Sequence, residues 1–106
     1  MVSDMARRPE DCHSKSEIRA EIDRLDRALV EMLAERFTYV RRMAELKSDP
    51  TEALVPGRVD EVLDRVAAAA RTAGFDEGLA RELWGRLIAW NVEFERRAIA
   101  SRLRSD

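Results

Sequence analysis

Apolar side chains recur along the first half of the chain at alternating spacings of four and three residues. The positions are Ile18, Ile22, Leu25, Leu29 and Met32. This spacing places them on one face of an amphipathic helix, and no glycine or proline interrupts the pattern before Pro50. A capping box, in which Glu17 follows Ser14 by three residues, marks the start. The pattern therefore predicts a helix from about Lys15 to about Lys47.

Turn and cap residues predict a loop and two further helices. The stretch from Ser48 to Gly57 contains Asp-Pro and Pro-Gly pairs, which are typical of turns. A second, shorter helix is expected from about Arg58 to Thr72, with Gly74 as its left-handed cap. Asp76 is then expected to cap a third helix that runs to roughly Leu103.

The composition agrees with an entirely helical protein. Charged residues make up 38% of the 106 positions and aromatic residues only 6%, with three prolines and four glycines. This profile is typical of helical proteins rather than sheet proteins. We expect an all-α fold with three helices per chain, long, short and long. They are expected to form a single domain at residues 14–106 after an N-terminal extension at residues 1–13.

Charge and cysteine content exclude several classes of function. The formal net charge is −2 and basic residues are interleaved with acidic ones, so nucleic acid is not an expected partner. The lone cysteine, Cys12, cannot form an intrachain disulfide, which fits a reducing compartment. Met1 to Pro9 hold no apolar core of a signal peptide, and no later stretch has the length of a membrane span. We expect a cytoplasmic protein with no membrane partner.

Arg36 is the first sign of a binding site, because it continues the apolar face of the first helix. Lys47 follows after eleven residues, a near-integral number of turns, so the two cations share one face about 16 Å apart. A cation where core is expected indicates a buried pocket for a small anion. The alternative is that the apolar face shifts around the helix along its length. Arg36 would then extend to water or form a surface ion pair.

The third helix carries a similar anomaly. One of its faces is made of Trp84, Ile88, Asn91, Glu95 and Ala98. Asn91 and Glu95 lie on successive turns and interrupt this apolar face. A buried Glu95 would either pair with a cation such as Lys47 or act as a hydrogen-bond donor in its neutral form. The alternative is that it belongs to a solvated run of charges with Glu93 and Arg97.

Metal and nucleophile chemistry are not expected. Cys12 and His13 have no further cysteine or histidine to complete a coordination sphere. Adjacent side chains without a third orienting group also make a poor nucleophile and base pair. The sequence has neither a glycine-rich phosphate loop nor a Ser-His-Asp arrangement, so we expect no metal and no cofactor.

Several short motifs together resemble one known family. They are Pro9-Glu10-Asp11-Cys12, Ile18-Arg19, Ile22 to Asp26, Arg36, Tyr39-Val40, Lys47 and Pro56 to Val59. From about Pro9 to Ile99 the chain resembles the small all-helical chorismate mutases. The Pro-Glu-Asp-Cys lead-in is most similar to their isochorismate pyruvate lyase branch. The resemblance implies an intertwined homodimer with two equivalent sites, each made mostly from one chain.

The resemblance also implies a role for each cation of the pattern. Arg36 and Arg19 would hold the two carboxylates of a small dicarboxylate substrate, with Arg19 donated to the site of the other chain. Lys47 would bond the breaking ether oxygen, and Arg58 would help to close the pocket. Asn91 is a further candidate for substrate binding. Helix geometry agrees with a shared site, because Arg19 and Arg36 are roughly 25 Å apart on one helix, too far for one such ligand.

Two positions depart from the mutase pattern. Val59 stands where many chorismate mutases have a glutamate that contacts the 4-hydroxyl group of chorismate. Glu95 stands where bacterial enzymes commonly have a glutamine, although fungal mutases use glutamate there. If Glu95 replaced that glutamine as a donor to the ether oxygen, it would have to be protonated, and activity would rise toward acidic pH.

The activity expected from these residues is pericyclic, with Lys47 and Glu95 as catalytic residues. The leading reaction is elimination of pyruvate from isochorismate to give salicylate, with rearrangement of chorismate to prephenate as a shared or minor activity. The alternatives within the family are a mutase for chorismate or for 4-amino-4-deoxychorismate. An alternative from another class is a non-catalytic helical partner of an enzyme of aromatic biosynthesis.

Overall fold

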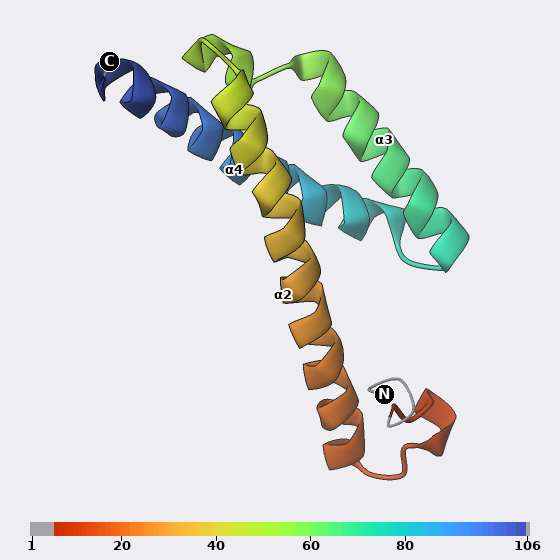
Figure 1. Ribbon diagram of the computed structural model, residues 1–106. Coiled ribbons are helices and arrows are strands. Elements are labelled where there is room, and N and C mark those ends of the chain that lie inside the picture. The colour runs from red at the N-terminus through yellow and green to blue at the C-terminus, as the bar shows by residue number, and fades with distance from the viewer. Residues whose placement is uncertain (1–5, 106) are drawn as a thin grey trace. The chain divides into compact units, whose positions relative to one another are not determined.

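Residues 6–105 are described by a computed structural model, and within this range the chain contains helices and no strand. The elements are η1 (Pro9–Asp11), α2 (Lys15–Leu46), η2 (Pro50–Ala53), α3 (Pro56–Ala73) and α4 (Glu77–Ser105) (Figure 1). The η elements are short 3₁₀ turns. The prediction of an all-α fold with a long, a short and a long helix is confirmed. None of these helices is both long and apolar enough to cross a membrane.

The chain divides into two compact units, and the boundary falls within α2, between Thr38 and Tyr39. The described part of the first unit consists of residues 6–38, with η1 and most of α2. The second unit consists of the end of α2 together with η2, α3 and α4. The boundaries expected from the sequence, an extension at residues 1–13 and one domain at residues 14–106, stay a prediction.

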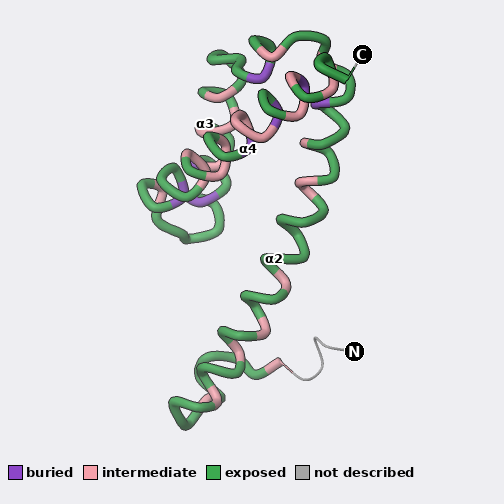
Figure 2. Tube along the Cα trace, turned by 90° about the vertical axis from the view of Figure 1, so that its left-hand side faces the viewer, coloured by how far each residue is buried: buried purple, intermediate pink, exposed green. Residues whose placement is uncertain are grey.

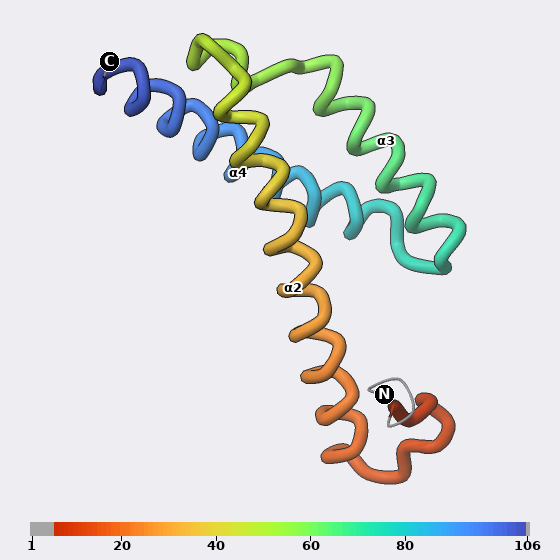
Figure 3. Tube along the Cα trace, in the orientation of Figure 1, coloured from red at the N-terminus to blue at the C-terminus, as the bar shows by residue number. Residues whose placement is uncertain are grey.

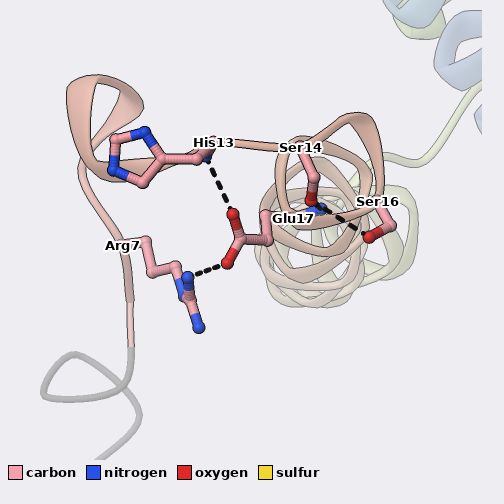
Figure 4. A network of polar contacts seen from close by, with 5 residues as sticks. All are labelled: Arg7, His13, Ser14, Ser16 and Glu17. Atoms are coloured by element: carbon pink, nitrogen blue, oxygen red, sulfur yellow. Dashed lines mark hydrogen bonds and ion pairs between the residues drawn. The ribbon is translucent and has the colours of Figure 1, made fainter.

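Helix α2 begins with a capping arrangement close to the expected one (Figure 4). The hydroxyl group of Ser14 accepts a hydrogen bond from the backbone N–H of Glu17 at 3.2 Å. In a capping box the glutamate accepts the N–H of the capping residue in return, but here Glu17 Oε1 accepts the N–H of His13 at 2.8 Å. The other carboxylate oxygen of Glu17 pairs with Arg7. Glu17 therefore ties the segment before α2 to the helix.

The same contacts predict how the start of α2 responds to acid. The hydrogen bond from His13 holds the pKa of Glu17 below its ordinary value, and the charge of Arg7 acts in the same direction. The stability that this carboxylate contributes is complete above its ordinary pKa, about 4.3, and is lost as the pH falls through the lowered pKa. We expect the amide proton resonance of His13 to shift below about pH 4, as the carboxylate of Glu17 takes up a proton. Glu17→Gln should abolish this shift, and an unchanged shift in that variant would assign it to another carboxyl group.

The apolar face of α2 is exposed throughout the first unit. Between Lys15 and Thr38 no residue of the helix is buried, and Figure 2 shows only exposed and intermediate positions there. Five large side chains of this face are 47–69% exposed, namely Ile18, Ile22, Leu25, Leu29 and Met32. Contiguous exposed apolar faces mark interaction surfaces in proteins. The core that the periodicity predicted is therefore not formed within this unit of a single chain.

The second unit has its core between α3 and α4, which lie side by side (Figures 1 and 2). Ala67 and Ala70 of α3 and Ala80 of α4 are each at most 6% exposed. Such small side chains allow two helix backbones to approach closely. Ile99, farther along α4, is the largest fully buried side chain of the described residues.

A tight turn joins α3 to α4 and follows the expected chemistry. Gly74 has the left-handed backbone conformation, with φ 77°, and the N–H of Phe75 bonds back to the carbonyl of Ala70 at 2.8 Å. At the start of α4, Asp76 Oδ2 accepts the N–H of Leu79 at 2.8 Å. Both predicted caps, Gly74 and Asp76, are confirmed.

The connection between α2 and α3 contains more helical structure than expected. The carboxylate of Asp49 caps η2 by accepting the N–H of Thr51 at 2.8 Å, and η2 packs against α4 with Ala53 buried. Helix α3 begins at Pro56, two residues before the start at Arg58 that was predicted from the sequence. Proline suits the first helical position because an N–H there would lack an intrahelical partner. The chain order from α2 through η2 to α3 and α4 can be followed in Figure 3.

Candidate functional site

An ion pair joins the end of α2 to α4 within the second unit. Lys47 directly follows the last residue of α2, and its Nζ lies 2.7 Å from Oε1 of Glu95. The Lys47 and Glu95 side chains are 18% and 10% exposed, so the pair is largely removed from water. Of the interpretations left open for Glu95 by the sequence, the structure has the one in which it pairs with Lys47.

Backbone contacts fix Lys47 at the end of α2. Its N–H donates to the carbonyl oxygen of Met43 at 3.0 Å and so continues the hydrogen-bond pattern of the helix. The guanidinium group of Arg102, in α4, donates to the carbonyl of Ala44 at 2.8 Å and to the carbonyl of Lys47. The last carbonyl groups of a helix have no intrahelical partner. They need a side-chain donor where the protein keeps water away from them.

Asn91 adds an amide to the same stripe of α4, about one turn before Glu95. Both residues are buried, at 7% and 8% exposure. Buried polar side chains cost free energy unless they are hydrogen-bonded. In the described residues every buried side-chain nitrogen and oxygen has a hydrogen-bond partner. The two polar residues of the stripe predicted on the third helix are therefore buried, whereas its apolar members Trp84, Ile88 and Ala98 are partly exposed.

The solvated run of charges exists, but Glu95 does not belong to it. Glu93 pairs with Arg96 and Arg97 at 2.5 and 2.8 Å, and both arginines are exposed. The hydrogen bond from Arg96 holds the pKa of Glu93 below its ordinary value. Side chains two residues apart on a helix point in directions that differ by about 200°. Glu93 and Glu95 therefore face different surroundings.

Arg58 lies in the first turn of α3 and is engaged with another side chain. Its guanidinium group lies 2.5 Å from Oε1 of Glu61, which also pairs with Arg65 at 3.1 Å. The Arg58 side chain is 57% exposed. Because a guanidinium group has five donors, Arg58 can contact a ligand while it stays paired with Glu61 or after that pair opens.

The other two arginines of the predicted site lie in the first unit. Arg19 is exposed near the start of α2, and Arg36 is half-buried near the end of this unit. At the rise of an α-helix, their separation along α2 is roughly 25 Å. The helix of one chain therefore does not bring both guanidinium groups to one small ligand. The anion pocket expected around Arg36 and Lys47 stays a prediction.

A separate hollow of about 330 Å³ lies along α4 and contains neither member of the ion pair. Its lining residues are Trp90, Glu93, Phe94, Arg97 and Ala98. The rings of Trp90 and Phe94 stack with their centroids 6.0 Å apart, and Trp90 is 62% exposed. No buried titratable side chain lines this hollow, so the candidate chemistry stays with Lys47 and Glu95.

Arg102 is a site residue that the sequence reasoning missed. It continues the stripe of Asn91, Glu95 and Ala98 at the next spacing of four, so a signal was present. A cation near the end of a helix also interacts favourably with the helix dipole from the surface, so the residue type alone does not identify a buried contact. Only the folded chain brings the end of α2 close enough to accept its hydrogen bonds.

The largely buried ammonium group of Lys47 and the amide of Asn91 can donate hydrogen bonds to an oxygen atom that gains negative charge, while the carboxylate of Glu95 orients the ammonium group. A donor fixed in surroundings with little water stabilises such charge more strongly than a donor in water. This chemistry requires an oxyanion or an ether oxygen near Lys47 Nζ, and it involves no covalent bond to the protein.

Comparisons with known proteins place these residues in a matched region. The sequence profile of the chorismate mutase type II family matches residues 18–96, a range that includes Lys47, Asn91 and Glu95. The chain is also 32% identical over 84 residues to an isochorismate pyruvate lyase of Pseudomonas aeruginosa. This stretch covers 79% of the present chain and 83% of that protein. Arg102 lies beyond the matched range of the family profile.

Proposed function

Because the chain belongs to the chorismate mutase type II family, we propose that it acts on a chorismate-type enolpyruvyl ether and releases pyruvate from isochorismate to leave salicylate. The lyase is favoured over the mutase because the similar Pseudomonas aeruginosa protein is an isochorismate pyruvate lyase. The observation that carries the proposal is the largely buried ion pair of Lys47 and Glu95 inside the matched region.

The proposed reaction is pericyclic and forms no covalent intermediate with the protein. The bond between the ring and the ether oxygen breaks, while a ring hydrogen moves to the methylene carbon of the enolpyruvyl group. That carbon becomes the methyl group of pyruvate, and the ring becomes aromatic as salicylate. Lys47 Nζ hydrogen-bonds the ether oxygen and stabilises the negative charge that develops there. The site also holds the ether in its reactive conformation.

Arginines are proposed to bind the two carboxylates of the substrate. A guanidinium group presents two parallel donors that match the two oxygens of a carboxylate. Arg36 binds one carboxylate and Arg19 of the other chain binds the second. Arg58 leaves Glu61 to help close the pocket over the substrate, and the amide of Asn91 donates a hydrogen bond to it.

An intertwined homodimer is the proposed active form. The exposed apolar face of α2 between Ile18 and Met32 would be buried by a second chain. The roughly 25 Å between Arg19 and Arg36 along one helix also requires that one of them come from a second chain. Both observations favour two chains that each complete the site of the other.

The pH dependence of turnover can show whether Glu95 orients Lys47 or donates a hydrogen bond to the substrate. An ionised carboxylate 2.7 Å from the ammonium group orients Lys47, whereas only a neutral one donates to the ether oxygen. The ion pair favours the first role. We therefore expect the pH profile of turnover between pH 5 and 8 to have the same shape for wild type and for Glu95→Gln. A rise of wild-type turnover toward acidic pH that Glu95→Gln flattens would instead assign the donor role.

A second candidate function follows from Val59. This half-buried residue, next to Arg58, has no group that can hydrogen-bond the 4-hydroxyl of chorismate. A mutase for 4-amino-4-deoxychorismate, which lacks that hydroxyl group, would tolerate valine there. Rearrangement of chorismate itself to prephenate is the remaining activity within the family.

The test is incubation of the purified protein with isochorismate, chorismate and 4-amino-4-deoxychorismate in parallel, with the products identified by mass. We expect salicylate and pyruvate from isochorismate, with the highest kcat/KM of the three. Lys47→Ala serves as the control for contaminating activities. A rearranged product from one of the other two substrates as the main outcome would favour a mutase. Turnover of none of them would contradict the proposal and favour a non-catalytic partner protein.

A further inference from the structure

Helix α4 contacts both the side chain and the backbone of Lys47. Glu95 lies against the ammonium group, and Arg102 donates to the main-chain carbonyl. We propose that Arg102 is a positioning residue that fixes the backbone of Lys47, so that the ammonium group is held where the reaction needs it. The inference rests on the proposed function, because it assigns Lys47 the role given there.

The contacts of Arg102 match the end of a helix. Its Nη1 donates to Ala44 and its Nη2 to Lys47, two carbonyls three residues apart at the end of α2. The carbonyl end of a helix carries partial negative charge, which a cation stabilises. A planar guanidinium group can donate to both oxygens at once, whereas an ammonium group offers donors from a single nitrogen atom.

The spacing on α4 makes the two contacts act together. Glu95 and Arg102 are seven residues apart, close to two full turns, so both project from one side of α4. The backbone on the other side of Lys47 is also held, because Ser48 N–H donates to a carboxylate oxygen of Glu52 at 2.9 Å. Without Arg102, the carbonyl of Lys47 would lose its described side-chain donor, and the last turn of α2 would fray.

Steady-state kinetics with isochorismate provide the first test. Arg102→Ala should lower kcat about tenfold and change KM by less than about threefold, because a misplaced donor weakens the transition state more than substrate binding. Arg102→Lys, which keeps the charge and one hydrogen bond, should recover part of this loss. Arg104→Ala is the matched control, since Arg104 is an exposed arginine of the same helix end, and it should be unchanged.

A double variant separates positioning from a general structural role. If Arg102 acts through Lys47, Arg102→Ala should change kcat by less than about twofold in the Lys47→Ala background. The same tenfold loss in both backgrounds would overturn the proposal, because it would mean that Arg102 acts on turnover independently of Lys47.

Amide hydrogen exchange tests the inference without any activity. The N–H of Lys47 should exchange about tenfold faster in Arg102→Ala than in wild type or Arg104→Ala. Exchange that is unchanged in Arg102→Ala would overturn the inference even if the enzyme is an isochorismate lyase. Faster exchange in a protein that turns over no candidate substrate would instead place the failure in the proposed function.

Discussion

Replacement of Lys47 by alanine is expected to lower the turnover of isochorismate by about a hundredfold or more, which corresponds to roughly 3 kcal/mol of lost transition-state stabilisation. The reason is that Lys47 Nζ is the proposed donor to the ether oxygen, and the surrounding burial makes its charge effective. The measurement is kcat by the appearance of salicylate, with folding of the variant checked by circular dichroism.

Lys15→Ala is the matched control for this prediction. Lys15 is exposed at the first residue of α2, and its removal should leave kcat unchanged. Lys47→Ala leaves Glu95 buried without this partner, so some loss of stability is also expected. If the folded variant lost less than about fivefold in turnover, roughly 1 kcal/mol, the role assigned to Lys47 would be wrong.

The second large effect is expected when two inactive variants are mixed. Arg19→Ala and Arg36→Ala should each lose about a hundredfold in kcat/KM, because each removes a charge-assisted pair of hydrogen bonds to a carboxylate. A heterodimer of the two chains would have one site with both arginines and one site with neither. Random exchange of subunits should therefore restore about a quarter of the wild-type activity.

Subunit exchange must be demonstrated by mass spectrometry of chains with different isotope labels. Restored activity that follows the fraction of heterodimer would support a site shared by two chains. Proven exchange without any recovery would mean that Arg19 and Arg36 serve sites within one chain or have other roles. Sedimentation equilibrium provides an independent check, since a stable folded monomer at micromolar concentration would contradict the dimer.

Local sequence chemistry predicted most of the fold. The caps at Gly74 and Asp76 formed as expected, because each depends on the conformational preference or hydrogen bond of one residue. The start of α3 was placed too late because the Pro-Gly pair was interpreted as a turn, although Pro56 is the first helical residue. Element boundaries of this kind depend on which of two local preferences prevails.

The candidate site was predicted less completely than the fold. Pairing of Glu95 with Lys47 was one of three interpretations of a polar break in an apolar stripe, and it is the one found in the folded second unit. The hydrogen bonds from Arg102 to the end of α2 were not predicted. They join Arg102 to Lys47 and Ala44, which precede it by 55 and 58 positions in the sequence. The proposed role of Arg19 depends on a second chain, whose position no pattern within one chain can fix.

The central claim is that the site transfers a ring hydrogen of isochorismate directly to the departing enolpyruvyl group. The most direct measurement is the turnover of isochorismate in deuterium oxide, with pyruvate trapped at once by reduction to lactate and both products analysed by mass. The account predicts salicylate together with lactate whose methyl group carries no deuterium from the solvent. Deuterium in that methyl group, or the absence of salicylate, would contradict it.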